Sequence, residues 1–244
     1  MDYMNNEETK TSRPLRMIGK MIKWMFIAVV VLMLLWLTLC SILQKGTPAM
    51  KKYVWTAEAA EQYAENKEFK IWNLTAFNTS SLDKIFYIEN LMYTEEPSQF
   101  QFMLRYNVHN ESVKKLSANS AEKEPFVFVL KDNKGKTYTK YEYMTDSALI
   151  YGYYRVVFSG VDTSEATELT VYIYRNNGEN TDFRSPVDSC IVWYNDGYKS
   201  KHKLTASEKK AAAKPSPLVS EFFEINDLNT ETDTDSEENT DSVT

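Results

Sequence analysis

The stretch QFQFMLRYNVH, residues 99–109, alternates apolar and polar side chains over most of its length. One set of alternate positions consists of Phe100, Phe102, Leu104, Tyr106 and Val108. The other set consists of Gln99, Gln101, Met103, Arg105, Asn107 and His109. Because successive side chains of a strand point to opposite faces, this pattern predicts an antiparallel strand with one buried and one solvated face.

Strand patterns recur on both sides of this stretch. FVFVLKD, residues 126–132, is apolar on both faces, which suits a central strand, and a turn at 132–135 leads into KTYTKYEY as a hairpin. Further strands are predicted at 85–93, 149–160, 169–176 and 190–195, with a Lys-rich edge strand over 198–204 after a turn at 195–197.

These seven or eight strands fall within residues 69–204, and no helical pattern of any length separates them. We therefore predict a mainly β chain with a single antiparallel β-sandwich, immunoglobulin-like in the broad sense. A small β-barrel is the alternative. The Cys…Trp…Cys spacing of true immunoglobulin domains is absent from the sequence, so the pattern does not specify the strand topology.

The stretch WMFIAVVVLMLLWLTLCSIL, residues 24–43, contains no charged residue. As a helix, its length matches the hydrocarbon core of a bilayer, about 30 Å, which predicts a transmembrane helix with the lipid bilayer as its partner. A cleaved signal peptide is the alternative. Its apolar region is usually shorter, and residues 44–50 show no clear small-residue cleavage site.

Basic residues near the span predict its orientation. Five precede it and three follow it: Lys10, Arg13, Arg16, Lys20 and Lys23 before, and Lys45, Lys51 and Lys52 after. The bias favours a cytoplasmic segment 1–23, with the β domain outside the cell membrane. Residues 44–68 are expected to form a juxtamembrane linker with a short helix near 57–67, capped by Thr56.

The C-terminal segment, residues 205–244, is Lys-rich at first and acidic at its end. The last part, NTETDTDSEENTDSVT, has almost no apolar side chain and cannot bury enough surface to fold by itself. We expect a disordered, solvated tail, with an electrostatic contact to basic residues as the alternative.

Few residues suggest catalysis. The two histidines, His109 and His202, have no Cys or His neighbour at metal-ligand spacing, and Cys190 is expected to fill the core. No glycine-rich phosphate loop is present, and a basic surplus of the kind that nucleic-acid binding requires is absent from the sequence. We predict a non-enzymatic protein without cofactor, metal site or nucleic-acid partner. A hydrolase with a composite site is the alternative.

The strand LTVYIYRN suggests a binding surface. If Leu169, Val171 and Ile173 fill the core, Tyr172 and Tyr174 face outward, where tyrosines stack on sugars or anchor proteins. Arg105 and Met103, on the second face of 99–109, complete the predicted binding residues. The expected function is a single-pass, membrane-anchored protein that presents a binding or assembly surface to an envelope protein. A module that binds carbohydrate or cell wall is the alternative.

Overall fold

A computed structural model describes residues 12–44, 47–65, 69–76, 85–118, 124–164, 166–193 and 199–222. The chain divides between Lys51 and Lys52 into two compact units. The predicted acidic tail and the turn at 195–197 lie outside the described residues.

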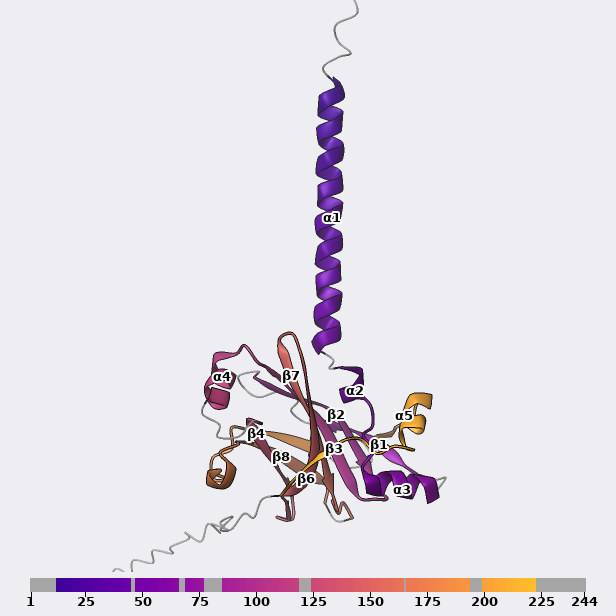
Figure 1. Ribbon diagram of the computed structural model, residues 1–244, viewed down its shortest axis with the longest axis vertical. Coiled ribbons are helices and arrows are strands. Elements are labelled where there is room, and N and C mark those ends of the chain that lie inside the picture. Colours follow the sequence, from indigo (N-terminus) through magenta and orange to yellow (C-terminus); the bar gives the residue numbers. More distant parts are fainter. Residues whose placement is uncertain are drawn as a thin grey trace, which may run out of the picture. The chain divides into compact units, whose positions relative to one another are not determined.

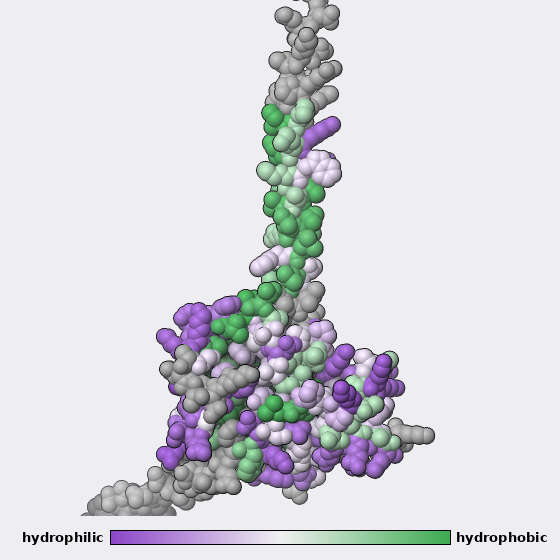
Figure 2. Space-filling model, viewed as in Figure 1, coloured by the Kyte–Doolittle hydropathy of each residue, from purple (hydrophilic) through white to green (hydrophobic). Residues whose placement is uncertain are grey.

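The first unit contains helix α1, Ser12–Gln44, and the short helix α2, Pro48–Lys51. Within α1, the 24 residues Met17–Cys40 have a mean hydropathy of 2.4 over their most apolar window, and none of that window is buried. On the face that Figure 2 shows, most of the coloured side chains of the helix are apolar. A membrane span has this length and composition, and so does a signal sequence. The first unit is therefore a candidate anchor or signal.

The second unit is mainly β (Figure 1). Its described helices are α3 (Ala57–Glu65), α4 (Glu111–Ala118), the 3-10 turn η1 (Gly178–Asn180) and α5 (Ala206–Ala211). Its described strands are β1 (Ile71–Ala76), β2 (Phe86–Thr94), β3 (Gln99–Asn107), β4 (Phe126–Asp132), β5 (Thr137–Tyr138), β6 (Lys140–Ala148), β7 (Tyr151–Ser159), β8 (Glu168–Arg175), β9 (Asp188–Trp193), β10 (Lys199–Lys201) and β11 (Val219–Phe222).

The strands form one curled antiparallel sheet in the order β11-β6-β7-β3-β2-β1-β9-β8-β4-β5, with β10 also paired to β1. Strand β1 joins the two halves of the sheet, because it pairs with β2 through Ile71–Asn73 and with β9 through Thr75 and Ala76. The halves face each other across the main core. Phe128 of β4 lies 5.6 Å from Phe102 of β3 and 5.7 Å from Tyr141 of β6, between ring centroids.

The predicted strands are present, but their number and connections differ from the expectation. The pattern missed β1, β11 and helix α4, and the described residues form eleven strands instead of seven or eight. The predicted hairpin is present between β4 and β5. Strand β6, which was expected to continue this hairpin, pairs instead with β7 and β11. The described strands support a curled antiparallel sheet and not, by themselves, an immunoglobulin-like sandwich.

The unit also extends beyond residues 69–204 in both directions. Residues 53–56, expected in the linker, are all buried, and α3 begins directly after them. At the other end, α5 and β11 belong to the folded unit, and β11 pairs with β6 through four residues. Two segments that the sequence pattern excluded from the domain therefore complete it.

Candidate functional site

The face of β3 that we expected to be solvated is buried. Gln99, Gln101 and Met103 have no exposed surface, and Arg105 is 6% exposed. The prediction of a half-buried strand with Arg105 and Met103 open for binding is therefore wrong. The alternation itself is correct, because Phe100, Phe102 and Leu104 lie in the main core on the opposite face.

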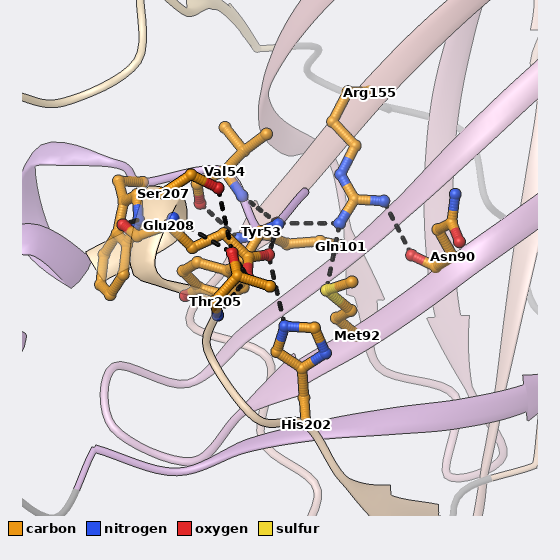
Figure 3. Close-up of polar contacts among 11 residues, drawn as sticks. Tyr53, Val54, Asn90, Met92, Gln101, Arg155, His202, Thr205, Ser207 and Glu208 are labelled. Carbon is orange, nitrogen blue, oxygen red and sulfur yellow. Dashed lines mark hydrogen bonds and ion pairs between the residues drawn. The ribbon is translucent and has the colours of Figure 1, made fainter. Parts of the chain in front are cut away.

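Part of this outer face is covered by residues 53–56, which we call the strap (Figure 3). The amide of Gln101 pairs with the strap backbone as a second strand would. Its Nε2 donates to the carbonyl of Val54 at 2.8 Å, and its Oε1 accepts from the N–H of Val54 at 3.2 Å. Gln99 Nε2 donates to Thr56 Oγ1 at 2.8 Å. A polar side chain of β3 thus provides hydrogen-bond partners for the buried N–H and carbonyl groups of the strap. Buried without partners, these backbone groups would lower the stability of the fold.

Glu208 of α5 fixes the other side of the strap. Its carboxylate accepts hydrogen bonds from the backbone N–H groups of Tyr53 and Thr205, each at 2.8 Å. The Thr205 hydroxyl donates a third at 2.7 Å. The bond from the Thr205 N–H to the carboxylate and the bond from the Glu208 N–H to the Thr205 hydroxyl together form a capping box at the start of α5. Trp55 Nε1 donates to the carbonyl of Glu208 at 2.9 Å. A short helix is thereby joined to a segment about 150 residues earlier.

The electrostatics of Glu208 follow from these contacts. Burial raises the pKa of its carboxyl, but the hydrogen bonds from Tyr53 and Thr205 and the nearby His202 together bring that pKa below its usual value. His202 Nε2 lies 3.3 Å from Glu208 Oε1, and its side chain is 16% exposed. His202 lies between lysines in the sequence, and the structure places it against a buried carboxylate.

Arg155 of β7 lies fully buried beneath the same face. Its guanidinium donates to the carbonyl of Asn90 at 2.7 Å, to Gln101 Oε1 at 3.2 Å and to Met92 Sδ at 3.4 Å (Figure 3). Asn90 lies at a register shift of β2 and has a φ of 51°, so the bulge turns its carbonyl toward the arginine. Burial lowers the pKa of Arg155 to about 10, so it stays charged at neutral pH.

A second group lies farther along the same face, beyond Met103. The Arg105 guanidinium lies 4.2 Å from the ring centroid of Tyr87 and 4.9 Å from that of Tyr151, and its Nη2 lies 3.1 Å from Glu89 Oε1. We call Tyr87, Arg105 and Tyr151 the arginine stack. Stacking of this kind stabilises a cation by roughly 0.5–2 kcal/mol, depending on its desolvation.

The predicted tyrosine pair lies in the other half of the sheet, on β8. Leu169, Val171 and Ile173 are in the core as expected. On the opposite face, Tyr174 is only 4% exposed, because the ring of Phe183 packs against it at 5.2 Å, and burial raises the pKa of Tyr174 to about 12. Tyr172 stays partly exposed. The pair lies on β8, which pairs with β4 and β9, whereas Arg105 and Met103 lie on β3, which pairs with β2 and β7.

The described residues contain no group of three or more His, Cys, Asp or Glu side chains that could hold a metal ion. Cys190 is buried in the main core, as predicted, and burial raises the pKa of its thiol to about 12. A thiol of this kind is a poor nucleophile at neutral pH. The chemistry that the outer face offers is hydrogen bonding and cation–aromatic stacking.

No family model, curated protein or solved structure matches this chain.

Sequence reasoning missed the strap and its partners. One local signal was present: Thr205 followed three residues later by Glu208 is the capping-box pattern. It predicts a helix start near 205, but not that the same carboxylate binds a backbone N–H about 150 residues earlier.

Proposed function

We propose that the chain is a single-pass, membrane-anchored, non-enzymatic protein whose β unit presents a binding or assembly surface at the outer side of the cell membrane. The observation that carries the proposal is α1, whose 24-residue segment Met17–Cys40 is long and apolar enough to cross a membrane and has none of its most apolar window buried. A few residues join it to a folded β unit. In this proposal the N-terminus is cytoplasmic and α1 is an uncleaved anchor rather than a signal sequence.

The strap limits where a signal sequence could be cleaved. Tyr53, Val54, Trp55 and Thr56 are structural residues of the β unit, so cleavage within them would remove part of its fold. Cleavage between α1 and Tyr53 would leave a new terminus directly before a buried segment. An uncleaved chain instead links the helix to a segment that is fixed on both sides.

The partner proposed for the β unit is an envelope protein, and an immunoglobulin-like sandwich remains the finer proposal for its fold. The two facing halves of the curled sheet support the sandwich description. The carbohydrate alternative now depends on Tyr172, because Tyr174 is buried. Among the residues that the structure describes, no specific group supports the hydrolase alternative.

Protease accessibility of a C-terminal epitope tag tests the proposal. In intact cells, or in spheroplasts where a wall is present, the tag should be digested before lysis, and the protein should remain at its full mass in the membrane fraction. Protection of the tag until lysis would overturn the orientation. A shorter mature form that begins after residue 44 and is released from membranes would overturn the anchor.

A further inference from the structure

We propose that the acidic C-terminal segment, residues 226–244, binds to a group of exposed lysines around α5 of the same molecule. We call this group the lysine patch, and it consists of Lys70, Lys201, Lys203, Lys209, Lys210 and Lys214. The contact forms within the β unit and does not require the membrane anchor.

The lysine patch is strongly basic because the one acid within its main segment is turned inward. Residues 199–214 contain six lysines and a single acidic residue, Glu208. Glu208 is only 2% exposed, and its carboxylate accepts hydrogen bonds from the N–H groups of Tyr53 and Thr205. It therefore does not offset the charge of the lysines at the surface.

The patch also extends to the neighbouring strand β1. The N–H of His202 bonds to the carbonyl of Ile71, which places Lys70, just before β1, next to Lys203, just after β10. Within the part of the chain that the structure describes, no ion pair joins a lysine of the patch to a carboxylate. An uncompensated group of positive charges attracts a flexible polyanion.

The acidic segment has the complementary charge. Residues 226–244 contain seven Asp and Glu residues and no Lys or Arg, whereas the rest of the chain is close to neutral. Blocks of like charge at a terminus often act as interaction segments. The segment of this chain with the strongest negative charge thus follows closely after the segment with the strongest positive charge.

The covalent connection keeps the two segments within reach of each other. Eight Cα steps separate Lys214 from Phe222, the last residue of β11, so the two lie at most about 30 Å apart. Residues 223–244 would span about 70 Å if fully extended, which is enough to bring the acidic side chains to the patch. A single exposed ion pair contributes little, but the tether gives several such pairs a high effective concentration.

A second group of exposed lysines offers a control. Lys140 of β6 is opposite Phe222 in the pairing with β11, so it lies closer to the start of the acidic segment than the patch does along the chain. Lys136 lies near the carboxylate of Asp162, and Lys140 lies near that of Glu142. Proximity alone would favour these two lysines, whereas uncompensated charge favours the patch.

Zero-length carbodiimide cross-linking of the full chain in detergent, with mass spectrometry of the products, tests the contact. Carboxylates of residues 227–241 should cross-link to the lysine patch in preference to Lys136 and Lys140. The yield should fall several-fold at 1 M salt, where the Debye length is about 3 Å instead of about 10 Å at 0.1 M. Yields that are highest at Lys140 would overturn the proposal. Cross-links found only between differently labelled copies would overturn the intramolecular contact in favour of a second copy.

Two double variants separate the charge of the patch from the rest of the surface. Lys209→Gln with Lys210→Gln should lower cross-linking at Lys203 several-fold, because local charge is removed while the measured lysine remains. Lys136→Gln with Lys140→Gln is the matched control and should leave cross-linking at Lys203 unchanged. All four substituted side chains are exposed, so both variants should unfold at the temperature of the native protein. Equal cross-linking at Lys203 in both variants would overturn the role of the patch.

Discussion

The two faces of β3 are equally buried but differ in what buries them. On the inner face, Phe100, Phe102 and Leu104 contact other apolar side chains of the curled sheet. On the outer face, Gln99 and Gln101 contact a backbone segment through directed hydrogen bonds. Apolar burial needs only suitable volume, whereas polar burial requires every partner in place. The comparison teaches that polar residues on one side of a strand do not establish that this side faces water.

The largest effect on the free energy of unfolding is expected at positions 102 and 101, neighbours in β3 whose side chains point to opposite faces. Phe102→Ala should lower the free energy of unfolding by about 3–5 kcal/mol, because it leaves a cavity among three packed rings. Gln101→Ala should cost less, about 1–3 kcal/mol, through unpaired groups on the strap. Urea denaturation of both variants measures the difference. Equal losses in the free energy of unfolding would show that the two side chains contribute equally to stability.

Arg155→Met tests whether the buried charge of Arg155 stabilises the polar outer face of β3. We expect a loss of about 1–3 kcal/mol in the free energy of unfolding, because the Asn90 carbonyl loses its charged donor. Exposed Arg184→Met serves as the control and should change stability by less than about 0.5 kcal/mol. Thermal unfolding compares the two. An Arg155→Met protein of unchanged or greater stability would show that an apolar residue can replace the charge there.

Glu208→Gln tests whether the stability of the polar outer face depends on pH. At neutral pH it should lower the free energy of unfolding by about 1–2 kcal/mol, since an amide cannot accept on both sides of the group. The pKa of Glu208 is lower in the folded protein than its usual value. Its stabilisation is therefore complete above the ordinary glutamate pKa of about 4.3 and is lost as the pH falls through the folded value.

The measurement is stability as a function of pH for the native protein and the Glu208→Gln variant. The difference between them should shrink in acid, and amide exchange at Tyr53 should quicken in the variant at neutral pH. A difference that is constant from neutral to acidic pH would contradict the assignment. Exposed Glu179→Gln is the matched control.

The smallest effect is expected on the other half of the sheet. Tyr172→Ala should cost about 0.2–1 kcal/mol, the usual range of a cross-strand contact, here with Val129 and Ser189. If the carbohydrate alternative holds, the variant should also lose retention on cell-wall glycan, measured by pull-down. Retention that is equal in both proteins, or absent in both, would remove Tyr172 as a sugar-binding residue.

Local patterns were enough to find most strands: period-two alternation predicted β3, and a run that is apolar on both faces predicted β4, because side-chain direction in a strand is a local property. Alternation was also enough to place Leu169, Val171 and Ile173 in the core. Alternation does not identify what covers each face. The burial of Met103 and Arg105 depends on tertiary contacts, and Tyr174 is covered by Phe183 from a turn outside its strand.

The candidate site was predicted less well than the strands, for the same physical reason. Gln101 pairs with Val54, and Glu208 pairs with Tyr53, across separations of 47 and 155 residues. No local pattern records such contacts. Strand β11 was missed because four residues between a Lys-rich stretch and an acidic one provide too short an alternation to recognise. The turn residue Leu149 was included within a predicted strand, since its apolar side chain is atypical for a turn.

The bond between Tyr53 and Glu208 has a consequence for biosynthesis. A ribosome makes the strap before any strand of the sheet, yet two of the groups that fix it, Glu208 and the N–H of Ser216 that bonds to Trp55, are among the last to be made. Contacts of such long sequence separation slow folding, because the intervening chain must be ordered first. The earliest segment of the β unit to leave the ribosome therefore gains its full set of bonds late, and a nascent chain stopped short of residue 208 has a strap that is bonded to β3 but not to Glu208 or Ser216.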